Sequence, residues 1–156
     1  MRFLALSVVA ALALASSAAA GPSPLVPPFT KLIVKKRAGA LAYAPTRSPS
    51  GYRYLNYSWS STKPTLTIRL HDKHYRPGNA RHTATFTASW YGGSLASCSN
   101  GKQKTIQYDG NKVYWDGQAA WRCVSGPGGR TVKLVATGPT LPDVALAQIV
   151  SSGKHL

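Results

Sequence analysis

Apolar and polar residues alternate along the middle of the chain. The segments 52–59, 65–72, 83–90 and 131–136 each place apolar residues at every second position. A period of two is typical of a β-strand that buries one face. The pattern therefore predicts half-buried antiparallel strands, with an apolar face and an opposite face rich in threonine and basic residues.

Turn residues separate these strands. Pro77-Gly78-Asn79 lies in a predicted loop over 72–81, and Asp109-Gly110 lies between alternating runs at 103–108 and 112–115. Asp-Gly in that position is a strong β-hairpin signal. With a further strand at 119–123 and a glycine-rich turn at 125–129, the sequence predicts about seven strands.

The period changes to that of a helix near the C-terminus. Leu146, Ile149 and Val150 share one side of a predicted helix over 144–151. Thr140 to Asp143 resembles a capping box, and Gly153 suits the residue after the helix end. The segment 30–43 fits a helix capped by Thr30 or a strand, and the helix is preferred.

A sheet with one apolar face must be covered, and the C-terminal helix is the available cover. We therefore predict an α+β fold: a curved antiparallel sheet with this helix packed on its apolar face. The alternative is an immunoglobulin-like β-sandwich closed by Cys98 and Cys123, but the cysteine spacing and the tryptophan positions disfavour it.

The N-terminus has the pattern of a secretory signal peptide. Arg2 precedes an apolar run, and small residues precede Gly21. The prediction is a secreted protein with a signal peptide at 1–20, a proline-rich leader at 21–29 and one domain at 30–156; a retained N-terminal anchor is the alternative. No later stretch is apolar enough to span a bilayer. In an exported chain, Cys98 and Cys123 are predicted to form a disulfide.

The charge balance indicates anionic partners. The chain holds 19 Lys and Arg against 4 Asp and no Glu, a net charge of +15. Such a surface attracts polyanions, so the candidates are an anionic cell-wall polymer, a lipid headgroup or nucleic acid. The charge also has a simpler interpretation, as a source of solubility.

Cations and tyrosines interleave at positions predicted to face away from the core. Such a surface binds sugars or bases by stacking and phosphates by charge, although strand composition alone also favours tyrosine. The tryptophans at 59, 90, 115 and 121 share the apolar positions and are predicted in the core. The candidate binding residues are Tyr52, Tyr54, Arg69, Lys112, Tyr114, Arg122 and Lys133.

Catalytic chemistry has little support in the sequence. A small hydrolase centred on His71, Asp72, His74 and His82 is an alternative function, and His71, His74 and His82 are an alternative metal set. The surrounding Lys and Arg residues oppose cation binding. We predict a non-enzymatic protein without a cofactor; the remaining alternative is a structural module that binds an unidentified protein partner.

Two regions carry a family resemblance. The run Ala44 to Tyr54 contains a P-T-x-x-P-x-G-Y pattern, which is the first region. The second region consists of the segments 113–115, 132–136 and 143–153 together with Trp121. They resemble an uncharacterised family of exported actinobacterial domains often linked to anti-sigma-factor-like proteins. The resemblance implies a curved half-barrel similar to that of lipoprotein carriers, with helices in its concavity and no catalytic residues.

Overall fold

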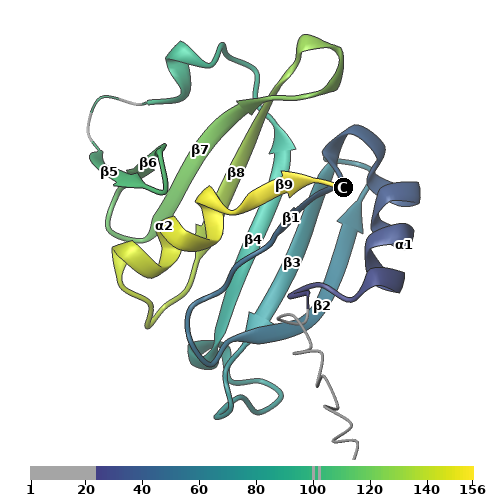
Figure 1. Ribbon diagram of the computed structural model, residues 1–156, viewed down its shortest axis with the longest axis vertical. Coiled ribbons are helices and arrows are strands. Elements are labelled where there is room, and N and C mark those ends of the chain that lie inside the picture. Colours follow the sequence, from purple (N-terminus) through teal and green to yellow (C-terminus); the bar gives the residue numbers. More distant parts are fainter. Residues whose placement is uncertain (1–23, 100, 102) are drawn as a thin grey trace, which may run out of the picture.

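A computed structural model describes residues 24–99, 101 and 103–156. Its centre is a seven-stranded antiparallel sheet in the order β2-β3-β4-β8-β7-β6-β5 (Figure 1). The strands are β2 (Arg53–Ser60), β3 (Thr65–His71), β4 (Thr83–Trp90), β5 (Lys104–Tyr108), β6 (Asn111–Trp115), β7 (Ala119–Ser125) and β8 (Thr131–Thr137). The elements outside this sheet are α1 (Pro28–Ala38), β1 (Tyr43–Pro45), α2 (Asp143–Ser151), β9 (Gly153–His155) and short 3-10 turns at Gly39–Leu41, Ala80–His82, Ala96–Cys98 and Pro127–Gly129.

One face of the sheet is covered by α2 and by the β1–β9 ribbon, which cross in front of it in Figure 1. Helix α2 packs against β5, β6, β7 and β8. Its residues Leu146, Ile149 and Val150 are buried, as the helical period predicts. The predicted α+β fold with an open sheet and a covering C-terminal helix is confirmed, and the sandwich alternative is wrong.

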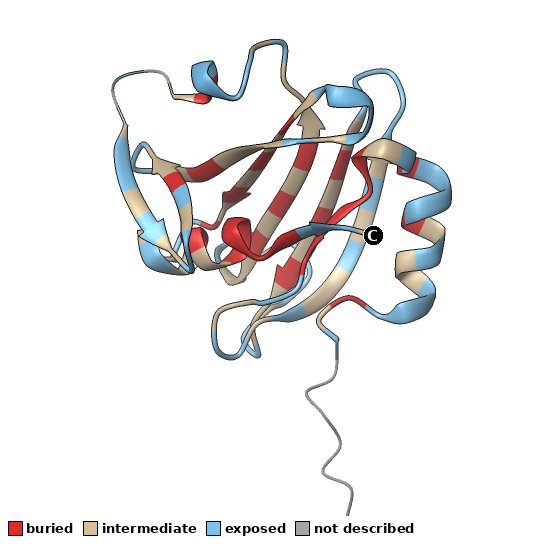
Figure 2. Cartoon of the chain, turned by 45° about the horizontal axis from the view of Figure 1, so that its top comes forward, coloured by how far each residue is buried: buried red, intermediate tan, exposed pale blue. Residues whose placement is uncertain are grey.

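The strand register explains the alternation in the sequence. Ile68 lies opposite Phe86, and Phe86 lies opposite Ala136, all fully buried. One residue along, Thr67 lies opposite Thr87 on the other side of the sheet, which we call the outer face. Figure 2 shows buried positions repeating along the central strands, because every second side chain points into the core.

The N-terminal part of the domain begins earlier than predicted. Helix α1 starts at Pro28, a position where the backbone N–H has no partner within the helix, so that a proline loses no hydrogen bond. Thr30 therefore lies inside the helix and not at its N-cap. Val26 is fully buried and Leu25 packs against the core. The described part of the leader therefore belongs to the fold, whereas the predicted signal peptide lies outside the described residues.

The ends of α2 also differ from the prediction. Pro142 occupies the N-cap, and the Thr140 hydroxyl donates to the Arg81 carbonyl at 2.9 Å, so there is no capping box. Gly153 belongs to strand β9, where Pro45 of β1 lies opposite it. Three-residue strands are too short to show a period, which is why the β1–β9 ribbon was not predicted.

Strand β2 contains a bulge that changes its pattern. The register shifts between Tyr54 and Asn56, so two residues of β2 replace one at this point. Tyr54 consequently lies opposite the buried Leu70, on the core face, and not on the outer face as predicted.

The outer face has a small buried cluster of its own. Cys98 and Cys123 form the predicted disulfide, with their Cα atoms 5.9 Å apart. The Trp121 indole N–H donates to the Cys98 carbonyl at 3.0 Å, and Trp121 is 3% exposed. Trp59, Trp90 and Trp115 contact the main core as predicted. Trp121 lies on the outer face instead of in the predicted core. The segment that contains Cys98, held by the disulfide, covers Trp121 there.

Candidate anion-binding surface

The four aspartates already have partners. Asp109 pairs with Arg47 at 3.0 Å and Asp143 pairs with Lys104 at 3.4 Å. Asp116 accepts backbone hydrogen bonds from residues 118 and 119, and Asp72 contacts His82 at 2.9 Å. Of the lysine and arginine side chains in the described part of the chain, only those of Arg47 and Lys104 form an ion pair with an aspartate carboxylate. Most of the positive charge has no internal counter-charge.

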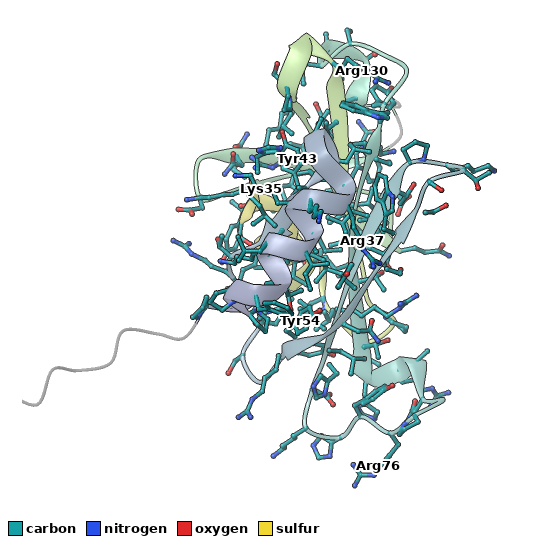
Figure 3. All side chains as sticks on the ribbon, turned by 90° about the vertical axis from the view of Figure 1, so that its right-hand side faces the viewer. Lys35, Arg37, Tyr43, Tyr54, Arg76 and Arg130 are labelled. Atoms are coloured by element: carbon teal, nitrogen blue, oxygen red, sulfur yellow. A yellow bond between two sulfur atoms is a disulfide. The ribbon has the colours of Figure 1, made fainter. Side chains whose placement is uncertain are left out.

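Several cations that form no ion pair with a described aspartate gather where β2 begins and β3 ends. The register sets Arg53 opposite His71 and Asn56 opposite Arg69, on the outer face. The loop 72–82 then adds basic residues beside them. Figure 3 shows Arg76 at this end of the molecule, away from Arg130 at the other. We call this set the basic end: Arg53, Arg69, Lys73, Arg76 and Arg81.

Basic-end residues line three hollows that are open to solvent. Arg53 and Lys73 line one of about 230 Å³. Arg69 and Tyr75 line a second of about 330 Å³. Arg53 also lines the largest, of about 580 Å³, with Tyr52, Tyr54, Thr46 and Ser48. Cations, phenol rings and hydroxyl groups therefore line adjacent depressions, a combination that holds phosphate, carboxylate or sugar groups.

The loop 72–82 is held in shape by its own aspartate. Asp72 accepts from the His74 amide at 2.8 Å, and its amide donates to the His82 carbonyl at 3.2 Å. The hydrogen bond with His82 is the main cause that lowers the pKa of Asp72. Because Asp72 stays charged and engaged, it tightens the loop that carries the three cations Lys73, Arg76 and Arg81.

Two of the three histidines of this region lie close together, and the third lies against a tyrosine. The His74 and His82 rings lie 5.7 Å apart, whereas the His71 ring contacts Tyr75 at 5.4 Å. Among the described residues, no group of three or more His, Cys, Asp or Glu side chains is arranged to hold a metal ion. The alternative metal set His71, His74 and His82 is therefore not assembled.

Arg122, one of the seven candidate binding residues, lies opposite Leu134 and faces the core. Its Nη2 donates to the Gly153 carbonyl at 3.1 Å, and its Nη1 contacts the Asn111 side chain. Burial lowers the pKa of Arg122. The prediction that Arg122 faces outward is wrong: the side chain connects β7 to β6 and β9 by hydrogen bonds.

The other six candidates fall into separate places. Tyr52 and Tyr54 pack at the margin of the core and line the largest hollow. Burial raises the pKa of Tyr54, and a hydrogen bond with Thr30 opposes that effect. Arg69 belongs to the basic end on the outer face, on strand β3.

Lys112, Tyr114 and Lys133 form a row of cations and rings on the outer face. The Lys112 Nζ lies 5.4 Å from the Tyr114 ring centroid, and the Tyr114 and Trp121 rings lie 6.0 Å apart. The Lys133 Nζ lies 4.9 Å from the Trp121 ring centroid. These lysines already stack on the protein's own rings, which leaves the row less available than the basic end.

Four members of the basic end were not among the sequence candidates. Arg53, Lys73, Arg76 and Arg81 are exposed, and three of them lie in a loop that has no periodic pattern. The available signal was local charge density, because the segment 69–82 contains four Lys or Arg residues and three of the chain's four histidines. Charge density alone does not show that β2 brings Arg53 to the same place.

No protein-family model matches the chain, and the searches of curated proteins and of solved structures found no similar protein. The resemblance to exported actinobacterial domains stays a prediction. Neither helix in the described part of the chain is long and apolar enough to cross a bilayer.

Proposed function

We propose that this protein is an exported, non-enzymatic domain that binds an anionic polymer at or outside the cell surface, through the basic end. The observation that supports this most is the distribution of charge at that end. Five cations share the region with one carboxylate, and that carboxylate is engaged by His82 and by the His74 amide. A ligand that supplies negative charge would offset the repulsion among these cations.

A polymer suits this surface better than a small anion. The hollows that the basic residues line are open to solvent, and Arg53 belongs to two of them. A chain with repeating phosphate or carboxylate groups can contact several cations at once, which raises its affinity over that of a single group. The tyrosines in the largest hollow add surfaces on which sugar rings can stack.

The test is binding of soluble polyphosphate and of an acidic glycan, measured by titration calorimetry at increasing salt. Affinity should fall steeply with salt, because bound cations release counterions from the polymer. Substituting Arg53→Gln, Lys73→Gln and Arg76→Gln together should lower the affinity. It should also reduce the logarithmic salt slope by about two, at ~0.7 per lost contact with a flexible chain.

The matched control removes the same charge elsewhere. Lys63→Gln, Lys112→Gln and Lys154→Gln alter three exposed lysines outside the basic end, and should have a much smaller effect. Equal losses from the two variants would mean that net charge alone drives binding and would contradict the proposed site. A neutral glycan bound equally well in high salt would also contradict it. A preference for nucleic acid over polyphosphate and the acidic glycan would identify the polymer as nucleic acid.

The contact between Asp72 and His82 favours one alternative, a hydrolase. A carboxylate that orients an imidazole is one part of a general acid–base pair. In the described part of the chain, however, no serine, threonine or cysteine side chain hydrogen-bonds to His82. The test is hydrolysis of phosphodiester and ester substrates by the native protein and by a folded His82→Ala variant. Activity that is present in the native protein and lost in the variant would mean that the basic end is catalytic and not only a binding surface.

A further inference from the structure

Helix α1 directs two large apolar side chains toward solvent. Phe29 is 73% exposed and Leu32 is 67% exposed, the highest values among the large hydrophobic residues described. Residues three apart share a helix face, and the buried Val34 and Ala38 lie on the opposite face. A helix on the surface of a soluble domain normally carries polar residues there, so packing within the domain does not account for this pair.

Cations follow the exposed pair toward the C-terminal end of α1. Lys36 lies four residues beyond Leu32, on the same face, and Lys35 and Arg37 flank it. These three side chains are exposed, and α1 contains no acidic residue. Figure 3 shows Lys35 and Arg37 projecting from α1, and Figure 1 places the helix at the side of the molecule, beside β2. The outward face of α1 is therefore accessible to a large flat partner.

We propose that α1 docks on an anionic lipid bilayer. Phe29 and Leu32 enter the boundary between headgroups and acyl chains, while Lys35, Lys36 and Arg37 contact headgroup phosphates. Apolar side chains next to lysine and arginine on one helix face are typical of helices that lie in the membrane interface. A soluble polyanion would use the cations alone and would leave Phe29 and Leu32 in water, which is why a bilayer is the better partner.

This surface shares no residue with the basic end, so the two proposals can fail independently. Binding of the purified protein is measured by sedimentation with phosphatidylglycerol-containing vesicles and with phosphatidylcholine vesicles. The protein should bind the anionic vesicles and bind the neutral ones far more weakly. Phe29→Ser with Leu32→Ser should lower anionic-vesicle affinity about tenfold or more, in proportion to the lost apolar area. Lys35→Gln with Lys36→Gln should lower it by roughly fivefold per cation at low salt.

Leu95→Ser with Val144→Ser is the matched control, because these residues are also exposed, at 47% and 54%, but lie outside α1. This variant should bind vesicles like the native protein. The Phe29→Ser/Leu32→Ser variant should still bind soluble polyphosphate normally, since it keeps every cation. Phe29→Trp adds a direct measurement: brominated lipid should quench its fluorescence more than that of the native protein.

Any one of the following results would overturn the proposal. The first is vesicle affinity that does not change when Phe29 and Leu32 are replaced. The second is equal loss in the Leu95/Val144 control. The third is a Phe29→Trp variant that binds vesicles without extra quenching. Vesicle binding lost through the Arg53/Lys73/Arg76 substitutions alone would assign the membrane contact to the basic end instead.

Discussion

At the residue scale, Gly153 shows how closely the β1–β9 ribbon approaches the sheet. A Cβ on Gly153 would lie 2.9 Å from two ring atoms of Phe86 and 3.0 Å from the Leu134 Cδ1. Both neighbours are fully buried and have little room to move. Gly153→Ala should therefore lower the free energy of unfolding by about 1–3 kcal/mol, as overpacked core positions do.

Urea unfolding monitored by circular dichroism measures this effect. Gly92→Ala is the control, because a Cβ on Gly92 would meet no atom within 4 Å and the residue has no positive φ. Its unfolding midpoint should stay near that of the native protein. Equal midpoints for Gly153→Ala and the native protein would show that β9 packs less closely on Phe86 and Leu134 than these distances indicate.

Asp72 gives a second residue-scale prediction, which concerns pH. Its folded-state pKa is lowered, chiefly by the hydrogen bond with His82. The contact therefore contributes its full stability above the unfolded-state pKa, near ~3.9, and loses it as pH falls through the lower folded-state pKa. Asp72→Asn should be less stable than the native protein at neutral pH, and the difference should shrink as the solution becomes more acidic than about pH 4.

Thermal unfolding over an acidic pH series tests this difference. Asp109→Asn is the control, because its partner Arg47 is exposed and such surface pairs contribute little. A constant gap between Asp72→Asn and the native protein at every pH would assign the loss to packing rather than to the carboxylate charge.

At the element scale, the disulfide holds the segment after β4 against β7. The bond joins Cys98 to Cys123 across 25 residues, and Trp121 donates to the Cys98 carbonyl beside it. Replacing both cysteines by serine should lower the free energy of unfolding by about 3.5 kcal/mol, from the added freedom of the unfolded chain. Trp121 should also become more exposed, because the segment that covers it is released.

Denaturant unfolding and tryptophan emission measure the two effects. The expected result is a lower midpoint together with a red-shifted native emission. An unchanged midpoint with unchanged emission would mean that Trp121 and its neighbours hold this segment without the covalent link.

The same elements show what the sequence could predict. Strands β3, β4 and β8 were predicted because each buries one face along its whole length, so periodicity was unbroken. The facing of Tyr54 was predicted wrongly because one bulged residue interrupts the alternation between Tyr54 and Asn56, whereas Trp59, beyond the bulge, faces the core as predicted. On β7 both faces are partly buried. Alternation of apolar and polar residues therefore could not show that Arg122 faces the core and that Trp121 lies on the outer face.

The candidate site was less predictable than the sheet. Arg69 was identified because it alternates with apolar neighbours in β3. Arg53 joins it through strand pairing, and Lys73, Arg76 and Arg81 join it through a loop closed by Asp72 and His82. Those contacts depend on tertiary structure, which neither period nor composition encodes.

At the scale of the whole molecule, the imbalance of charge opposes folding. The net charge is +15, and two of the described Lys and Arg side chains pair with an aspartate. Repulsion among like charges destabilises the compact state, and salt screens it over a distance of ~8–10 Å near physiological ionic strength. The free energy of unfolding should therefore rise as sodium chloride is added from low concentration.

Polyphosphate should stabilise the protein at much lower concentration than sodium chloride, because a ligand that binds the native state adds its binding free energy. Thermal unfolding at matched ionic strength separates the two effects. The Lys63/Lys112/Lys154 variant should lose part of the response to salt but keep most of the response to polyphosphate. The Arg53/Lys73/Arg76 variant should lose a similar part of the salt response and most of the polyphosphate response. Stability that falls as salt is added would contradict this account, because it would mean that attractive charge pairs outweigh repulsion in the folded protein.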